Sequence, residues 1–510
     1  MKFRASTGMN SAKFAQPITS NPKMTYLKGS CPNMHIYDAI IVGARVAGCA
    51  TGMLLAKAGF DILVVDRDAL PSDKPHSTHL IHPPGIRRLR DWGLLQDIEN
   101  SGCPPIHEYG LAVGTMDLMA PLPPDGDVST AFAPRRRVLD AILLDAAVAA
   151  GAEVRPETLA TGLVYEQERV VGVRLRSGGR EVVERARLVI GADGVNSRVG
   201  TWAGAQKYLE RPRRLTSIWS YWTGTSVTEV PTWRDDHNYA FAWPTNDGAV
   251  LAGVTWRSED FKRLKIKDKE AALFGVMDRF DPQLAAQMRV GERIEEWRTG
   301  SVPNYFRESF GAGWALVGDA GYCRDPSTAA GITDALRSAE YLAEEIICAW
   351  EGKVSEEQAL ARYEYRRNVR QRPIYEYTTD FARLDPYPSD VLEIMTKASS
   401  VPRFAQGLTG LFAQTQDPLE FFSPHNMSQI LRETGAPESF RIGALKAISS
   451  PNVYRLPGVP AVMRAMLASR LGDMGDYLRE AERARNRWRG MTGWQSNPEL
   501  LEEKWSTPAS

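Results

Sequence analysis

The chain has 510 residues, of which 43% are hydrophobic and 24% charged, a composition typical of a globular protein with more than one domain. Lys and Arg together number 62, as do Asp and Glu, so no net charge draws the chain to nucleic acid or to an anionic membrane surface. No apolar run approaches the roughly 20 residues that span a bilayer. The five cysteines are scattered without a CxxC pair, which argues against a zinc site or a disulfide framework and favours a reducing, cytoplasmic compartment.

The segment before the first predicted strand, residues 1–36, is rich in Ser, Thr, Asn, Lys and Met and shows no sustained hydrophobic period. It lacks the apolar core of a secretory signal, whereas its basic residues leave a transit peptide open. The simpler interpretation is a disordered extension in which Met24 or Met34 is the working start. We leave this segment out of the fold prediction.

The first predicted unit, residues 37–67, reads as strand, tight turn, helix and strand. Residues 39–42 and 62–65 are short apolar runs typical of strands buried in a parallel sheet. The turn is Gly43-Ala44-Arg45-Val46-Ala47-Gly48, and Asp66 ends the second strand. This is the layout of a dinucleotide-binding unit, in which the helix N-terminus faces a pyrophosphate and the acid binds a ribose. Arg45 replaces the middle glycine of the usual pattern, and its guanidinium either approaches a phosphate or points to solvent.

A shaped loop is predicted for residues 71–84, where prolines and histidines are dense, and a helix for residues 85–98. Loops at the carboxyl ends of parallel strands carry the ligand in sheets of this type. The candidates to line a site are therefore His76, Ser77, Thr78, His79 and His82. Three histidines this close invite a metal site, but no acid or cysteine clusters nearby to complete the ligands, and no metal is predicted.

A helix that opens with three arginines at 135–137 is predicted to run to about Ala150. Either these arginines form a solvated face, or one of them reaches a cofactor phosphate or ring. Residues 151–188 alternate apolar and polar side chains, which predicts a small antiparallel meander that feeds a buried strand at 188–190. That strand ends in the tight turn Asp193-Gly194, after which a helix begins with exposed N–H groups.

The stretch from 214 to 257 is predicted to be rich in strands and is strongly aromatic. Tyr239, Phe241 and Trp243 alternate along one predicted strand and therefore share a face. This face either packs against helices or forms a hydrophobic wall around a flat substrate. Together with His79, these three residues are the pocket candidates.

The last short strand, residues 314–317, runs into a glycine-bearing loop at 318–331, and a long helix follows from Ile332 to about Trp350. Small residues at the end of this loop let the backbone approach a ligand, and the helix N-terminus can stabilise negative charge on it. Residues 355–510 read as mostly helical, with helices expected at 355–370, 391–399, 460–471 and 475–489. The sequence contains no internal repeat and no second dinucleotide-binding fingerprint.

Three glycine-bearing turns thus stand in order: VGARVAG with VVDR, then GADGVNSR, then GDAGYCRDPSTAAGITDA. Together they resemble the FAD-dependent monooxygenases of the para-hydroxybenzoate hydroxylase type, the class A flavoprotein aromatic hydroxylases, over roughly residues 38–365. The resemblance implies an α/β (α+β) fold with a Rossmann-like FAD-binding domain, an interleaved antiparallel substrate sheet and a C-terminal helical region. The expected boundaries are 1–36 for the extension, 37–205 and 301–352 for the FAD-binding domain, 206–300 for the substrate sheet and 353–510 for the helical region.

The resemblance also implies which residues hold the cofactor. The first turn would cradle the FAD pyrophosphate, Asp66 would bind the adenosine ribose with Arg67 near the adenine, and Arg136 would lie beside the FAD. The Asp-Gly turn is associated in the family with both FAD and NAD(P)H, Asp319 with the ribityl-pyrophosphate region, and Pro326 with the isoalloxazine ring. The implied cofactor-binding residues are Gly43, Ala44, Arg45, Ala47, Gly48, Asp66, Arg67, Arg136, Asp193, Gly194, Asp319, Pro326, Gly331 and Ile332.

The family chemistry would use NAD(P)H as a transient co-substrate and oxygen to hydroxylate or epoxidise a hydrophobic, aromatic or polyketide-like small molecule through a flavin hydroperoxide. The protein would supply positioning and a dry pocket, so no catalytic triad is expected. A small-molecule substrate is the expected partner, with neither nucleic acid nor a membrane span. The C-terminal helices would cover the pocket, pair two chains as a homodimer, or do both.

Three alternatives remain open. A flavin-dependent halogenase would share the FAD fold, but its W-x-W-x-I-P motif is not matched by Trp219-Ser220-Tyr221-Trp222. A flavin-dependent reductase of the geranylgeranyl-reductase type would act on a prenyl chain, and the aromatic stretch does not exclude it. A non-catalytic FAD-binding protein is disfavoured by the intact loop at 318–331.

Overall fold

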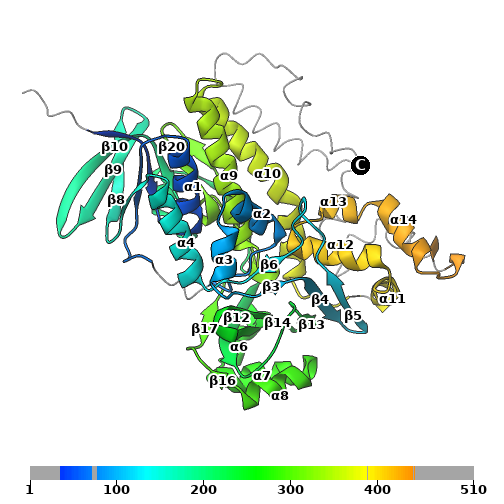
Figure 1. Cartoon of the computed structure of the whole chain (residues 1–510). Coiled ribbons are helices and arrows are strands. Elements are labelled where there is room, and N and C mark those ends of the chain that lie inside the picture. The colour runs from blue at the N-terminus through cyan, green and yellow to red at the C-terminus, as the bar shows by residue number, and fades with distance from the viewer. Residues whose placement is uncertain (1–34, 72–76, 388, 440, 443–510) are drawn as a thin grey trace, which may run out of the picture. The chain divides into compact units, whose positions relative to one another are not determined.

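The computed structural model describes residues 35–71, 77–387, 389–439 and 441–442 (Figure 1). The described residues from Ile36 onward belong to one compact unit. Most of the expected N-terminal extension, and the helices expected at 460–471 and 475–489, lie outside the described residues. None of the described helices has the length and hydropathy that crossing a membrane requires.

One sheet is mostly parallel and has the strand order β19-β20-β10-β1-β2-β7; β10 and β20 are labelled on the left of Figure 1. Its strands are β1 (Ile36–Val42), β2 (Ile62–Val65), β7 (Glu153–Arg155), β10 (Arg180–Gly191), β20 (Trp314–Leu316) and the antiparallel edge strand β19 (Phe310–Gly311). Ile41 of β1 pairs with Ile190 of β10 and with Val64 of β2. Every residue of β2 is buried, as expected of an apolar run covered on both faces. The predicted α/β sheet is confirmed.

Different layers cover the two faces of this sheet. On one face, α1 (Val46–Lys57), α4 (Arg136–Ala149) and α9 (Gly331–Trp350) pack with Ala39, Ile41 and Val64. On the other, the hairpin of β8 (Leu159–Glu166) and β9 (Arg169–Ser177) packs with Ile40 and Leu63. The first half of β10 pairs antiparallel with β9 and its second half pairs parallel with β1, so the predicted meander is confirmed.

A second sheet has the strand order β16-β12-β15-β14-β13-β4-β5 and is antiparallel except where β13 meets β4. Its strands are β4 (Glu108–Val113), β5 (Met116–Pro121), β12 (Leu215–Thr223), β13 (Thr232–Arg234), β14 (Asn238–Pro244), β15 (Val250–Arg257) and β16 (Glu292–Arg293), and β17 (Arg298–Gly300) pairs beside β12. Ala240 and Ala242 of β14 belong to the core shared with α7 (Lys269–Phe280) and α8 (Pro282–Val290). Tyr239, Phe241 and Trp243 lie in another core, with the C-terminal helices, so their predicted shared face is confirmed.

Two predicted helices need correction. The helix expected at 85–98 is two helices, α2 (Pro83–Asp91) and α3 (Leu95–Asn100), because Gly93 between them has a φ of +85°. The helix expected to end at 370 continues to Phe381 as α10 (Glu356–Phe381) and contains Pro373. A proline removes one helical hydrogen bond, but burial of Tyr375 and of the apolar residues around it stabilises the continued helix.

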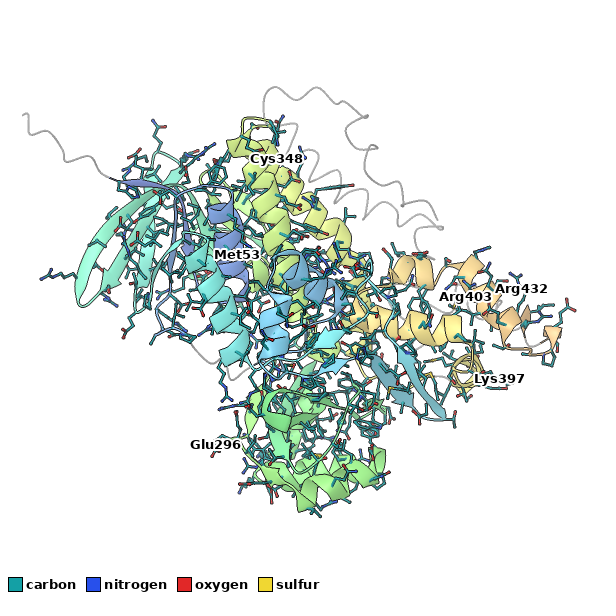
Figure 2. The ribbon with its side chains drawn as sticks, in the orientation of Figure 1. Met53, Glu296, Cys348, Lys397, Arg403 and Arg432 are labelled. Atoms are coloured by element: carbon teal, nitrogen blue, oxygen red, sulfur yellow. The ribbon has the colours of Figure 1, made fainter. Side chains whose placement is uncertain are left out.

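The described part of the chain beyond α10, which ends at residue 442, contains four further helices, as a helical region was predicted there. The helices are α11 (Ser389–Ala398), α12 (Pro402–Ala413), α13 (Pro418–Phe421) and α14 (Pro424–Glu433). Figure 2 shows Lys397, Arg403 and Arg432 on α11, α12 and α14. The Arg403 guanidinium donates to Glu433 at 3.0 Å, which links α12 to α14.

The remaining elements of the described chain up to α9 are short. They are β3 (Pro105–Ile106), β6 (Ala131–Phe132), α5 (Arg198–Trp202), β11 (Lys207–Arg211), η1 (Asn246–Gly248), α6 (Ser258–Leu264), β18 (Asn304–Arg307), η2 (Gly318–Ala320), β21 (Tyr322–Cys323) and η3 (Pro326–Thr328). β18 pairs with β11 and β21, and this pairing holds the loop before α9 beside the second sheet.

Candidate active site

A cavity of about 840 Å³ opens where the carboxyl ends of β1 and β2, the loop before α9 and the second sheet meet. All three predicted turns reach it, and so does the aromatic face of β14. The predicted site residues that line it are Gly43, Arg45, Ala47, Asp66, Arg67, His79, Arg136, Asp193, Gly194, Tyr239, Phe241, Trp243, Asp319, Pro326, Gly331 and Ile332. Ala44 and Gly48 do not line it.

The first turn is shaped by glycines that have different tasks. Gly43 has a φ of +110°, and a Cβ there would lie 2.4 Å from the Ala192 oxygen. A Cβ on Gly48 would lie 1.7 Å from the Gly43 oxygen, so Gly48 lets α1 pack on the turn. No side chain caps the N-terminus of α1, and its first residues line the cavity. Arg45 forms an ion pair with Asp68 at 2.6 Å, so the cation at this turn is paired with an acid.

Asp66 organises the first turn from the end of β2. Its Oδ2 accepts the Ala44 N–H at 2.8 Å, and its Oδ1 accepts the Asp68 N–H at 2.9 Å. A carboxylate oxygen can accept more than one hydrogen bond, so Asp66 retains acceptor capacity for a hydroxyl in the cavity. Arg67, by contrast, is exposed beside it.

Two predicted cofactor residues are engaged within the protein. The Arg136 guanidinium donates to both oxygens of Asp140, one turn further along α4. The Asp193 carboxylate accepts the Ser197 hydroxyl at 2.5 Å and the N–H groups of Arg198 and Val199 at 2.6 and 3.0 Å. Asp193 therefore holds the start of α5 in place, and both side chains still border the cavity.

The loop from Gly318 to Gly331 lies between the first turn and the second sheet. A Cβ on Gly318 would lie 2.8 Å from the Ala47 Cβ, so this loop and the first turn are in close contact. The Tyr305 hydroxyl donates to the Asp319 carbonyl at 2.6 Å and fixes the start of the loop. A Cβ on Gly331 would meet no atom within 4 Å, and no side chain caps the N-terminus of α9 that begins there.

Two buried histidines hold the loop after β2 in place. His79 has a φ of +49°, and its Nε2 lies 3.0 Å from the Tyr221 hydroxyl. His82 bridges the Tyr109 hydroxyl and the Thr328 carbonyl at 2.7 and 2.8 Å. Burial lowers the pKa of His79 to about 3 and that of His82 to about 4, so both rings are neutral near pH 7. No group of His, Cys, Asp or Glu that could hold a metal ion occurs in the described part of the chain.

The aromatic face of β14 is continued by the C-terminal helices. The Phe241 and Trp243 rings stack at 4.9 Å, and Tyr239 meets Phe381 of α10 edge to face at 5.6 Å. A smaller recess extends from the cavity between β4, β14 and α12 and includes Leu408 and Phe412. The sequence predicted this helical region without a motif that would assign α12 to the wall of a site.

Asp325, just before Pro326, is a cavity residue that sequence reasoning missed. It is 2% exposed, and its backbone N–H donates to the Asn304 Oδ1 at 2.6 Å. Its Oδ1 accepts the Ser327 N–H at 3.1 Å. The sequence signal was its place inside the third glycine-bearing turn, but burial of the carboxyl becomes visible only in the structure.

The walls of the cavity fit FAD chemically. The uncapped N-termini of α1 and α9 border the same cavity, and helix N-termini stabilise both a pyrophosphate and negative charge on a reduced flavin ring. The first turn and Asp66 would hold the adenosine and pyrophosphate, and the loop that ends at Gly331 would face the ring. The open space beside Gly331 leaves room for that approach.

The family model of the FAD binding domain matches residues 36–378, more than half of the chain. The chain therefore belongs to this family, and its class is that of the flavin-dependent oxidoreductases. The curated digeranylgeranylglycerophospholipid reductase of Methanosarcina acetivorans is 28% identical over 314 residues, which cover 59% of this chain and 72% of the relative.

Solved structures share the fold. A flavin-dependent brominase superposes with a TM-score of 0.65 at 19% identity, covering 76% of this chain and 95% of the brominase chain. A probable FAD-dependent monooxygenase from Pseudomonas aeruginosa superposes with a TM-score of 0.61 at 21% identity, covering 68% of this chain and 96% of its own. At these identities the two likenesses concern the fold alone.

Proposed function

We propose that the protein is an FAD-dependent reductase that saturates carbon–carbon double bonds in a long apolar substrate of the isoprenoid class. The observation that carries the proposal is the aromatic wall of the 840 Å³ cavity beside the loop that ends at Gly331, which a small recess of about 20 Å³ extends. None of the described residues that line this recess is Asp, Glu, Lys or Arg, and Leu111, Leu408 and Phe412 form much of its wall. A hydrocarbon chain gains free energy by leaving water for such a surface. The relatives named as reductases of a geranylgeranyl lipid support the same substrate class.

Bound FAD would supply the hydride, with NAD(P)H as the proposed electron donor. The chain's own residues would bind, orient and exclude water. Tyr239, Phe241 and Trp243 would hold the substrate against the ring from the side of the second sheet. His82 would keep the loop before α9 at a fixed distance from β4 through its two hydrogen bonds.

Monooxygenation is the second candidate. The stacked pair of Phe241 and Trp243 also suits a flat aromatic ring, and the three turns resemble those of aromatic hydroxylases. In this case the protein would hydroxylate or epoxidise an aromatic or polyketide-like molecule and would consume oxygen in step with NAD(P)H.

A reductase and a monooxygenase differ in the mass that the substrate gains when it becomes product. Purified protein would be supplied with NADPH or NADH and either a geranylgeranyl lipid or a panel of aromatic and polyketide-like compounds, with and without oxygen. A reductase yields a product heavier by two hydrogen atoms in both atmospheres. Addition of one oxygen atom to the product, in air only, would overturn the proposed reductase and favour the monooxygenase.

A further inference from the structure

The acids that border the cavity differ in how they are satisfied. Asp66 accepts two backbone N–H groups, Asp68 pairs with Arg45, and Asp193 accepts three donors. Asp334 is bound by Arg324 at 3.0 Å and by Gln371 at 3.0 Å. Asp325 differs from these four acids, because its Oδ2 is buried and makes no hydrogen bond of standard geometry with the described residues.

The position of Asp325 is fixed from two sides. Asn304 accepts its backbone N–H, and the Asn304 side-chain amide donates to the Pro212 carbonyl at 2.9 Å. The Ser327 N–H donates to Oδ1 of Asp325, so Oδ2 is the carboxyl oxygen that this turn does not bind. The hydroxyl of Ser327 is also buried and makes no hydrogen bond of standard geometry with the described residues, although it lies close enough to the Asp325 carboxyl to lower its pKa. This short turn therefore brings two incompletely satisfied polar side chains to a cavity whose facing wall is aromatic.

We propose that Asp325 is the proton donor of the reduction, delivering a proton from its carboxyl group to one carbon of the substrate double bond. This assignment rests on the proposed reductase function. The hydride for the other carbon would come from bound, reduced FAD, which would be oxidised by two electrons, so that two C–H bonds would form as the π bond is lost. Asp325 is left as a carboxylate and is reprotonated from solvent before the next turnover.

The surroundings of Asp325 let its carboxyl group hold a proton up to about pH 6. Burial raises its pKa to about 6, and this effect outweighs Ser327, the Leu215 N–H and the charge of Arg324, which all lower the pKa. Arg324 directs its guanidinium toward Asp334 and Thr378 instead. The other titratable groups that interact with Asp325 are the Tyr239 phenol and the Cys323 thiol, whose pKa values are both raised above their ordinary values, chiefly by burial. A group that holds its proton until about pH 6 is suited to act as a general acid.

The first test reads the carboxyl itself in the FAD-bound protein without turnover. Infrared difference spectra would be recorded between about pH 5 and 8, around the pKa of about 6. We expect a buried carboxylic acid signal that is lost as the pH rises through about 6 and is missing in Asp325→Asn. Asp117→Asn, on the exposed face of β5, should keep the signal. A parent protein whose Asp325 is fully ionised at pH 5 would overturn the assignment.

The second test follows reduction of a geranylgeranyl lipid by the dithionite-reduced protein without oxygen. Asp325→Asn keeps the acceptor for the Ser327 N–H, so FAD content and flavin reduction should match those of the parent. Product formation should fall by about 100-fold or more, and the loss of rate above about pH 6 should disappear. If the parent reduces the lipid and Asp325→Asn reduces it at the same rate with the same pH profile, Asp325 is not the proton donor, whereas the proposed reductase function still stands. If the parent reduces no double bond, the proposed function falls, and the donor role of Asp325 falls with it.

Discussion

The His82 Nε2 lies 2.8 Å from the carbonyl oxygen of Thr328. A carbonyl can only accept, so Nε2 carries the proton and Nδ1 accepts from the Tyr109 hydroxyl 2.7 Å away. One neutral imidazole thus joins the loop after β2, the strand β4 and the loop that ends at Gly331. The position of that last loop, where the flavin ring is expected, depends on this ring.

His82→Ala should therefore destabilise the protein and weaken FAD binding together. Loss of the ring leaves the buried Tyr109 hydroxyl and the Thr328 carbonyl without partners, which costs about 1–3 kcal/mol. Chemical denaturation and a flavin titration measure the two effects. His237→Ala removes an exposed ring and should change neither quantity. Unchanged FAD affinity in a folded His82→Ala protein would show that the loop is held by other contacts.

Stability should fall in mild acid because of both buried histidines. Their folded-state pKa values of about 3 and 4 lie below the ordinary value near 6.5 that they regain on unfolding. The unfolded chain therefore binds more protons than the folded chain, so the stabilising contribution is complete above about pH 6.5 and is lost as the pH falls toward 4. His82→Gln should reduce the slope of the unfolding free energy against pH in this window. An unchanged slope would mean that the His82 ring is not buried as a neutral group.

Asp66→Ala should lower FAD affinity without unfolding the chain. Loss of a charge-assisted hydrogen bond to a ribose costs about 1.5–3 kcal/mol, or about 10- to 150-fold in Kd. Asp66→Asn retains an oxygen that can accept the Ala44 N–H and should lose less. Asp117→Ala is the surface control. Equal FAD binding by the parent and Asp66→Ala would show that the acid at the end of β2 does not face the ribose.

Gly48 and Gly331 should respond to substitution in opposite ways. A Cβ on Gly48 would collide with the Gly43 oxygen, so Gly48→Ala should destabilise even the FAD-free protein, on the order of 3 kcal/mol. A Cβ on Gly331 meets open space, so Gly331→Val should leave the FAD-free protein stable and weaken its binding of FAD. Thermal unfolding of the FAD-free variants and flavin titration separate the two effects. Parental FAD binding by Gly331→Val would remove the flavin-facing role of this residue.

The recess beside α12 should set the preferred chain length of the substrate. Leu408→Phe would shorten it, and kcat/KM for a geranylgeranyl lipid should fall by about 10-fold or more while a shorter prenyl chain is less affected. Phe412→Ala should shift the preference toward longer chains. Leu264→Ala, on the exposed surface of α6, serves as the control. Equal losses for all chain lengths in Leu408→Phe would place the substrate elsewhere.

Local patterns were enough to predict the βαβ unit, the three turns and the shared face of Tyr239, Phe241 and Trp243. Each of these depends on a period or a turn that is written within a few residues. The break at Gly93 and the continuation of α10 through Pro373 were missed, because long-range packing decides whether a glycine or proline ends a helix. The role of Asp193 was also missed: its carboxylate accepts backbone N–H groups at the start of α5, a contact that the sequence pattern does not reveal.

The sequence predicted the turns that are expected to hold the cofactor, but it did not predict the recess or the role of Asp325. The recess takes Leu111 from β4 and Phe412 from α12, which lie far apart in the sequence and carry no motif. Asp325 stood inside a recognised turn, yet its chemistry depends on burial and on a missing partner for Oδ2, which no spacing reveals. Properties that arise from tertiary contacts need the structure.

The reductase proposal is tested most directly by a single turnover without oxygen. The FAD-bound protein would be reduced with dithionite, freed of excess reductant and mixed with a geranylgeranyl lipid while the flavin absorption is followed. If the protein is a reductase, the oxidised flavin spectrum returns at a rate that depends on the lipid concentration, and one double bond is saturated for each flavin that is oxidised. A flavin that stays reduced until air is admitted, with a product that then gains one oxygen atom, would contradict it.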